Sequence, residues 1–212
     1  MKTKKFTTSQ LTILGLMAGI LFLMAYTPLG YLNIGPLAVT FNVIPVAVCA
    51  IVLGPTGGAI AGAVFGLTSF MQAIGIGGVS ALGSALFQIN PFMTAVQCFG
   101  ARILDGICIG FIYRAVHKKA NTYVSCAVTG FFSAFLNTLF FMTALIVMFG
   151  NTELIRNLMG GHNIIVGCCL MVGVNAISEM VSSTIITAAV GTALSKAHLI
   201  PAVQIVKTDT AA

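Results

Sequence analysis

Residues 43–74 read VIPVAVCAIVLGPTGGAIAGAVFGLTSFMQAI, a run of 32 residues without a single charge. A bilayer core about 30 Å thick needs only about 20 apolar residues per helix, so this run is too long for one ordinary span. The Gly54-Pro55 pair, with Gly57 and Gly58 close behind it, interrupts helical hydrogen bonding and permits a turn. We therefore predict two membrane helices here, a short one and a longer one, joined at Gly54-Pro55.

Similar apolar runs recur along the whole chain. Hydrophobic residues make up 58% of its 212 residues, and the mean hydropathy of +1.05 is far above that of soluble domains. The other runs cover residues 9–27, 92–114, 123–149 and 164–195. A cleaved signal peptide is the alternative for the first run, but no convincing small-x-small cleavage site follows it. The sequence predicts an all-α membrane protein, a single compact bundle of six transmembrane helices.

The basic residues orient this bundle, because cytoplasmic loops of membrane proteins are enriched in Lys and Arg. Six spans leave only Arg156 outside and embed Arg102, whereas a single span over residues 43–74 would spoil the bias. The residues placed inside are Lys2, Lys4, Lys5, Arg114, Lys118, Lys119, Lys196 and Lys207. We expect both termini to be cytoplasmic, with a six-helix domain over residues 1–200 and a short cytoplasmic tail over residues 201–212.

The net charge of +6 reports this orientation and gives no support for a nucleic-acid partner, since no aromatic residues interleave the basic segments. Six cysteines share no metal-ligand spacing and are interpreted as small apolar fillers: Cys49, Cys98, Cys108, Cys126, Cys168 and Cys169. A Gly-x-x-x-x-Gly-Lys-Ser/Thr loop, a His-Glu-x-x-His pair and a Gly-x-Ser-x-Gly elbow are absent. We therefore expect no ATP hydrolysis by this chain, no metal and no cofactor.

Polar residues embedded in the apolar runs carry the functional signal, because each is costly in hydrocarbon and must face protein or water. Arg102 and Asp105 are three residues apart, so a structural ion pair is the alternative to ligand binding at Arg102. Asn175 and Glu179 lie on one helix face, where interhelical hydrogen bonding is the alternative. The candidate binding residues are Asn33, Gln72, Gln97, Arg102, Asn137, Asn175 and Glu179.

Two outer connections are too apolar for free surface loops. Residues 28–36 read PLGYLNIGP, and residues 75–91 are apolar and rich in glycine. Apolar loops above a bundle with a polar interior suggest a lid over a pocket. A pocket of this kind, entered from outside, suits a small and partly apolar solute.

Small residues at helical spacing let helices approach closely in lipid, where little hydrophobic drive exists between them. Two sets are interpreted as packing within the bundle: Gly58, Gly62 and Gly66, and Gly106 with Gly110. A third set, Gly15, Ala18 and Gly19, leaves two interpretations open, packing inside the bundle or contact with another subunit.

Five segments in register with the six predicted spans point to one family. They are IP with LGP at 44–45 and 53–55, FGLTSF at 65–70, ARILDG with GFIYR at 101–106 and 110–114, LNT at 136–138 and NAISE at 175–179. In order, and over nearly the whole chain, they resemble the substrate-binding S component of energy-coupling factor (ECF) vitamin transporters. Within that family the sequence looks nearest to the branch with predicted pantothenate carriers.

The resemblance implies a multi-pass protein of a prokaryotic plasma membrane that captures a vitamin or related micronutrient from outside. Such S components are not enzymes; they dock on a transmembrane T component driven by two cytoplasmic ATPases, and are thought to topple to release the solute. The family's coupling signature, Ala-x-x-x-Ala on the first helix, reads Gly15-x-x-x-Gly19 here, which keeps small residues. Proline commonly precedes the Arg102 position in the family, whereas Ala101 does so here.

The solute is left open by the sequence. Arg102 can meet a carboxylate such as that of pantothenate. If Asp105 already neutralises Arg102, Glu179 would instead favour an amine-bearing ligand, such as a pyridoxine-like or deazapurine compound. The competing functions are a stand-alone membrane scaffold and an intramembrane enzyme that uses Glu179 as acid or base. A second carboxylate, metal pair or nucleophile near Glu179 is missing, which argues against the enzyme.

Overall fold

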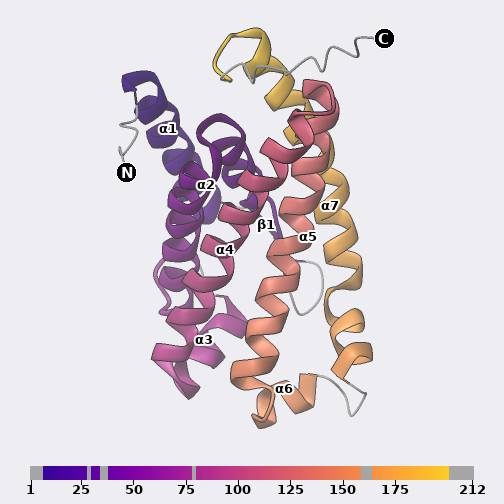
Figure 1. The fold of residues 1–212 in the computed structure, drawn as a ribbon. Coiled ribbons are helices and arrows are strands. Elements are labelled where there is room, and N and C mark those ends of the chain that lie inside the picture. Colours follow the sequence, from indigo (N-terminus) through magenta and orange to yellow (C-terminus); the bar gives the residue numbers. More distant parts are fainter. Residues whose placement is uncertain (1–6, 28–29, 34–37, 78–79, 159–163, 201–212) are drawn as a thin grey trace, which may run out of the picture.

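The computed structural model describes residues 7–27, 30–33, 38–77, 80–158 and 164–200 as a helical bundle with one two-stranded hairpin (Figure 1). In chain order the elements are α1 (Thr8–Ala25), β1 (Tyr31–Asn33), β2 (Ala38–Thr40), α2 (Val43–Ala73), α3 (Ala81–Ile89), α4 (Pro91–His117), α5 (Thr122–Phe149), α6 (Glu153–Leu158) and α7 (Ile164–Lys196). Four predicted runs become α1, α4, α5 and α7 with ends that agree within three residues. The helices α3 and α6 lie in segments that the sequence treated as connections.

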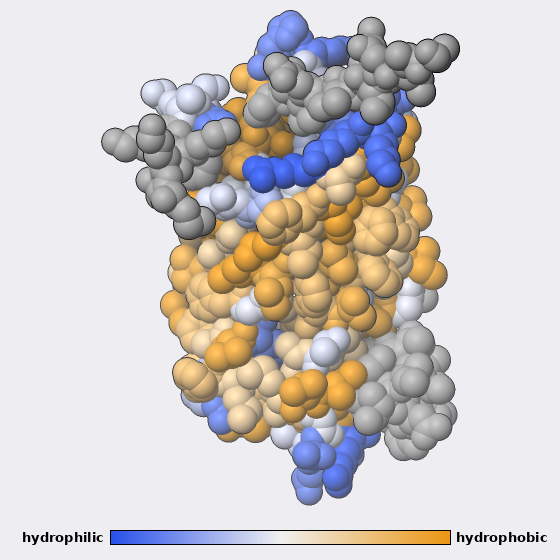
Figure 2. Space-filling model, in the orientation of Figure 1, coloured by the Kyte–Doolittle hydropathy of each residue, from blue (hydrophilic) through white to orange (hydrophobic). Residues whose placement is uncertain are grey.

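Five helices of the described part are long and apolar enough to cross a membrane: α1, α2, α4, α5 and the Asn175–Lys196 part of α7. Figure 2 shows an apolar surface around the middle of the bundle and hydrophilic residues at its two ends. In Figure 1 the start of α1, the α4–α5 connection and the end of α7 lie at one end, while α3 and α6 lie at the other. The protein is therefore a helical multi-pass membrane protein.

The long helix α2 reverses direction at Gly54, as the sequence predicted. Gly54 has φ 71° and ψ −162°, a conformation open almost only to glycine, and Pro55 follows it. A Cβ added to Gly58 would lie 3.1 Å from the Cβ of Ala50. Residues eight apart in a straight helix are about 12 Å apart, so the two arms of α2 must fold back on each other.

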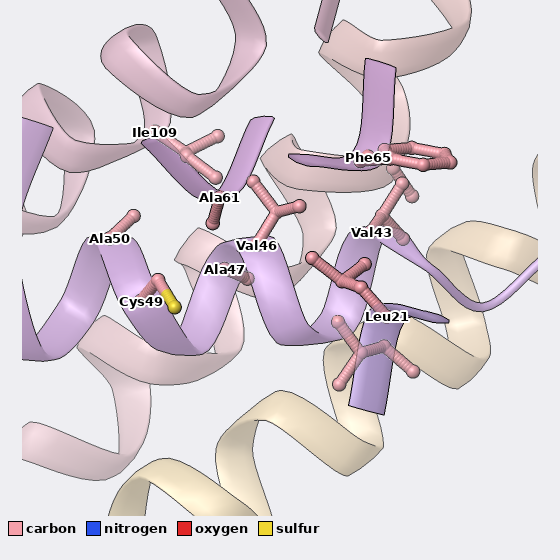
Figure 3. Close-up of a cluster of buried hydrophobic side chains, with 11 residues drawn as sticks. Leu21, Val43, Val46, Ala47, Cys49, Ala50, Ala61, Phe65 and Ile109 are labelled. Atoms are coloured by element: carbon pink, nitrogen blue, oxygen red, sulfur yellow. The ribbon is translucent and has the colours of Figure 1, made fainter. Parts of the chain in front are cut away.

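The two arms of α2 differ in reach. At about 1.5 Å per residue, residues 43–53 form an arm about 16 Å long and residues 55–73 one about 28 Å long. Only the second arm can cross the hydrocarbon core. Figure 3 shows side chains of both arms, among them Ala50 and Ala61, in one buried cluster with Leu21 of α1 and Ile109 of α4. The first arm therefore begins inside the bundle.

Glycines join α2 to α4 along most of the second arm. A Cβ on Gly58 would collide with the carbonyl oxygen of Gly106, and one on Gly62 would collide with that of Arg102. A Cβ on Gly66 would lie 2.9 Å from the carbonyl oxygen of Cys98. The prediction that these glycines pack within the bundle is confirmed.

A short antiparallel hairpin, which the sequence did not predict, connects α1 to α2. Its strands β1 and β2 pair with Tyr31 opposite Thr40, and β2 also contacts α7. The hairpin therefore enters the bundle beside the start of the first α2 arm.

Candidate functional site

Most of the predicted binding residues are buried and come from four helices. The buried side chains are Gln72 on α2, Gln97 and Arg102 on α4, Asn137 on α5, and Asn175 and Glu179 on α7. Asn33 belongs to β1, but its side chain lies outside the part of the structure that is described. Because buried polar groups need partners, their hydrogen bonds decide which of them are free for a ligand.

Arg102 projects from α4 between two aromatic side chains. Its Cζ lies 4.7 Å from the ring centroid of Phe65 on α2 and 5.5 Å from that of Phe141 on α5, within the range of cation–π attraction. Its Nη1 donates a hydrogen bond to the carbonyl oxygen of Cys98 at 3.2 Å. Its Nε has no hydrogen-bond partner among the described residues. A buried guanidinium thus retains donor capacity.

Asp105 does not form a direct ion pair with Arg102. The two side chains are close enough to interact electrostatically, yet the guanidinium hydrogen bond goes to Cys98. Asp105 is buried, and its Oδ1 lacks a hydrogen-bond partner in the described part of the chain. The geometry therefore argues against the alternative in which Arg102 and Asp105 form a structural ion pair.

Glu179 holds the hairpin in the bundle. Its Oε1 accepts a hydrogen bond from the backbone N–H of Thr40, at 2.6 Å across 139 positions of sequence. The carboxylate also lies within electrostatic range of Arg102 on α4. Thr40 in turn accepts a hydrogen bond at its Oγ1 from the backbone N–H of Asn42 at 3.2 Å. Glu179 therefore connects α7 to the segment that starts α2.

Asn42 is the residue that sequence reasoning missed. Its side chain is fully buried, and neither Oδ1 nor Nδ2 has a hydrogen-bond partner in the described structure. It was overlooked because it stands one position before the apolar run and has the pattern of an ordinary helix cap. The length of the first arm could have revealed it, since a helix about 16 Å long cannot span the membrane and must begin at depth.

Asn137 and Gln97 also carry unpaired atoms. Ser133, one turn before Asn137 on α5, donates from Oγ to the carbonyl oxygen of Val43 at 3.2 Å. The Oδ1 of Asn137 and the Nε2 of Gln97 have no partner among the residues that are described. Gln72 differs, because its Nε2 donates to the carbonyl oxygen of Ala25 at 2.6 Å and ties α2 to the end of α1.

The small-residue patch of α1 faces open space. A Cβ added to Gly15 or Gly19 would have nothing within 4 Å, and both glycines are exposed. Ala18 between them is half-buried. Of the two interpretations, the geometry of the described residues favours a surface available to another subunit over packing inside the bundle.

Comparison with known proteins agrees with this architecture. Residues 9–191 match the family described as "ECF transporter, substrate-specific component". The Pantothenate transporter PanT of Leuconostoc mesenteroides is 32% identical over 178 residues, which cover 81% of each chain. The Pantothenic acid transporter PanT of Lactococcus lactis is 28% identical over 208 residues, covering 92% of this chain and 98% of that one. With that match over most of its length and a polar centre inside a membrane bundle, the chain belongs to the substrate-specific components of ECF transporters.

Proposed function

We propose that this S component captures pantothenate from outside the cell. Arg102 carries the proposal, because it is a buried cation that keeps an unpaired Nε and has no direct ion pair in the described structure. Pantothenate ends in a carboxylate, and arginine binds carboxylates through charge-assisted hydrogen bonds. Both relatives named above are pantothenate transporters by name, which supports the same solute.

The other buried groups suit the rest of this molecule. Pantothenate carries a central amide, two hydroxyls and a geminal dimethyl group, so it needs amide partners and apolar walls. Gln97, Asn137 and Asn175 supply amides, and the rings beside Arg102 supply apolar surface. Glu179 accepts the N–H of Thr40, so its role in this proposal is to hold the hairpin in the bundle and not to bind the solute.

Binding measurements on the purified, lipid-reconstituted protein test this function. We expect pantothenate to bind the wild type, and pantothenol, in which an alcohol replaces the carboxylate, to bind at least tenfold more weakly. The variant Arg102→Gln should lose most of the affinity for pantothenate and little of that for pantothenol. No pantothenate binding by the wild type, or equal binding of both solutes, would refute the proposal.

The proposed topology has six membrane-embedded helices and cytoplasmic termini, with the two arms of α2 counted separately. The reversal at Gly54 supports this count, since it divides α2 into two membrane-embedded arms that fold back on each other. Lys118, Lys119 and Lys196 are exposed at the end where α4 meets α5 and α7 ends. Because basic loops stay in the cytoplasm, this end is proposed to face inward.

The exposed patch of α1 is proposed to contact the T component, which two cytoplasmic ATPases would drive. A Cβ added to Gly15 or Gly19 would meet open space, with nothing within 4 Å. Small residues at this spacing let a second helix approach the backbone closely in lipid. Solute capture and coupling would then use different helices.

A further inference from the structure

We propose that Asn42 binds the hydroxy-amide unit of the solute, with Nδ2 donating to its carbonyl oxygen and Oδ1 accepting from the adjacent hydroxyl. This inference rests on the capture of pantothenate proposed above. Its starting point is a side chain with no exposed surface whose two polar atoms are both unpaired within the described structure. A buried amide in this state loses its hydrogen bonds to water without replacing them.

Asn42 lies at the start of α2, where this helix meets α5 and α7. Its backbone N–H donates to Thr40, which Glu179 of α7 holds in place. The next residue, Val43, accepts a hydrogen bond from Ser133 of α5, one turn before Asn137.

Helix α4 approaches the same place through the contact of its Arg102 with an aromatic ring of α2. Val43 belongs to the same buried cluster as Phe65, and Figure 3 shows their side chains next to each other. Phe65 is the ring over which Arg102 of α4 lies. Asn42 therefore directly precedes Val43, which packs with Phe65, and Phe65 in turn contacts Arg102.

Helix capping does not explain Asn42. Asn90 and Asn121 stand at the N-caps of α4 and α5, and their side chains accept hydrogen bonds from Met93 and Val124. Asn42 has the same position at α2, but its side chain makes no capping hydrogen bond and its backbone is helical. The usual stabilising role of asparagine at this position is thus absent.

The two unpaired atoms restrict what the side chain can bind. A carboxylate only accepts hydrogen bonds and would leave Oδ1 unpaired, while an ammonium only donates and would leave Nδ2 unpaired. A group with an acceptor and a donor on neighbouring carbons pairs with both. In pantothenate the carbonyl of the amide and the hydroxyl on the next carbon form such a group, and Arg102 remains for the carboxylate.

The variant Asn42→Leu tests this role by two readouts with opposite signs. Affinity for pantothenate should fall roughly tenfold or more, because two hydrogen bonds to a buried ligand are lost. The unfolding temperature of the solute-free protein should stay level or rise, because two unpaired buried atoms are replaced by an apolar group of similar shape. The control Asn121→Leu should lower the unfolding temperature, through loss of its cap, and leave affinity unchanged.

Analogues of the solute identify the contact. The analogue of pantothenate without the hydroxyl next to the carbonyl should bind the wild type more weakly than pantothenate does, but the two should bind Asn42→Leu alike. Persisting discrimination against this analogue in the variant would overturn the inference, as would unchanged affinity for pantothenate. If Asn42→Leu does not fold, Asn42→Ala replaces it in both measurements. Failure of the wild type to bind pantothenate would instead refute the proposed function.

Discussion

At the scale of single residues, the charge of Arg102 sets the character of the site. A charge inside a bilayer must face protein groups that compensate it. Here the rings of Phe65 and Phe141 lie at 4.7 and 5.5 Å from its Cζ, and its Nη1 donates to the carbonyl oxygen of Cys98. In the described structure neither Asp105 nor Glu179 forms an ion pair with the guanidinium, and its Nε lacks a partner, which supports the proposal that it binds the carboxylate of a solute.

Substitutions at Glu179 separate a role in holding the hairpin from a role in touching the solute. Glu179→Gln keeps an oxygen for the N–H of Thr40 and removes a negative charge, so affinity for pantothenate should be retained or increase. Glu179→Ala leaves that buried N–H unpaired, at about 1–3 kcal/mol, and should lower both affinity and unfolding temperature. Calorimetric titration and thermal unfolding measure the two effects. Equal loss of affinity in both variants would mean that the carboxylate itself contacts the solute.

The sequence predicted those site residues whose polarity contrasts with their surroundings. Arg102 and Asn137 stand inside long apolar runs, so their burial followed from the run itself. Asn42 stands just before the uncharged run that begins at Val43, and its burial depends on how deep the first arm of α2 begins. The burial of Gln72 was also predicted, but its hydrogen bond to the carbonyl oxygen of Ala25 depends on where the neighbouring helix α1 ends. Partners across helices are set by tertiary packing, which periodicity does not encode.

At the scale of elements, the reversal of α2 shows which local signals were sufficient. Gly54 supplies a backbone conformation that other residues rarely adopt, and Pro55 removes a helical donor. Both effects are local, so the break was predictable from the sequence. The hairpin of β1 and β2 was not, because strands of three residues carry no readable alternation. Its place in the bundle depends on the distant contact between Thr40 and Glu179.

The free face of α1 can be tested by filling it. In the double variant Gly15→Leu and Gly19→Leu, the added side chains meet open space in the isolated protein, so stability and solute affinity should hardly change. Overpacking a contact with the T component should cost about 1–3 kcal/mol or more and abolish ATP-dependent uptake. Binding, thermal unfolding and uptake with the T component and ATPases are the measurements.

A matched control for this variant is Gly58→Leu. Gly58 meets the backbone of Gly106, so a side chain there should destabilise the isolated protein itself. Normal uptake by the α1 double variant would exclude this face from coupling. Loss of solute binding in the double variant would mean that Gly15 and Gly19 pack inside the bundle.

At the scale of the whole molecule, the orientation can be measured with single cysteines in a background that lacks the native ones. Asn157 on α6 and Lys118 after α4 are exposed at opposite ends of the bundle. A membrane-impermeant thiol reagent added to intact cells should label Asn157→Cys and leave Lys118→Cys unlabelled until the membrane is permeabilised. Labelling of both positions in intact cells, or of Lys118→Cys alone, would contradict the proposed topology.

The glycine contact between α2 and α4 limits which positions of this protein can be substituted during evolution. Gly58 and Gly106 each face the main chain of the other helix, so any side chain at either place forces the helices apart. Asn42 is proposed to contact the solute through side-chain atoms, so its position can exchange one side chain for another of similar volume. Related sequences can therefore change the bound solute by substituting the buried polar residues of the site. The glycines where α2 and α4 contact each other must be conserved, because they set the distance between the two helices.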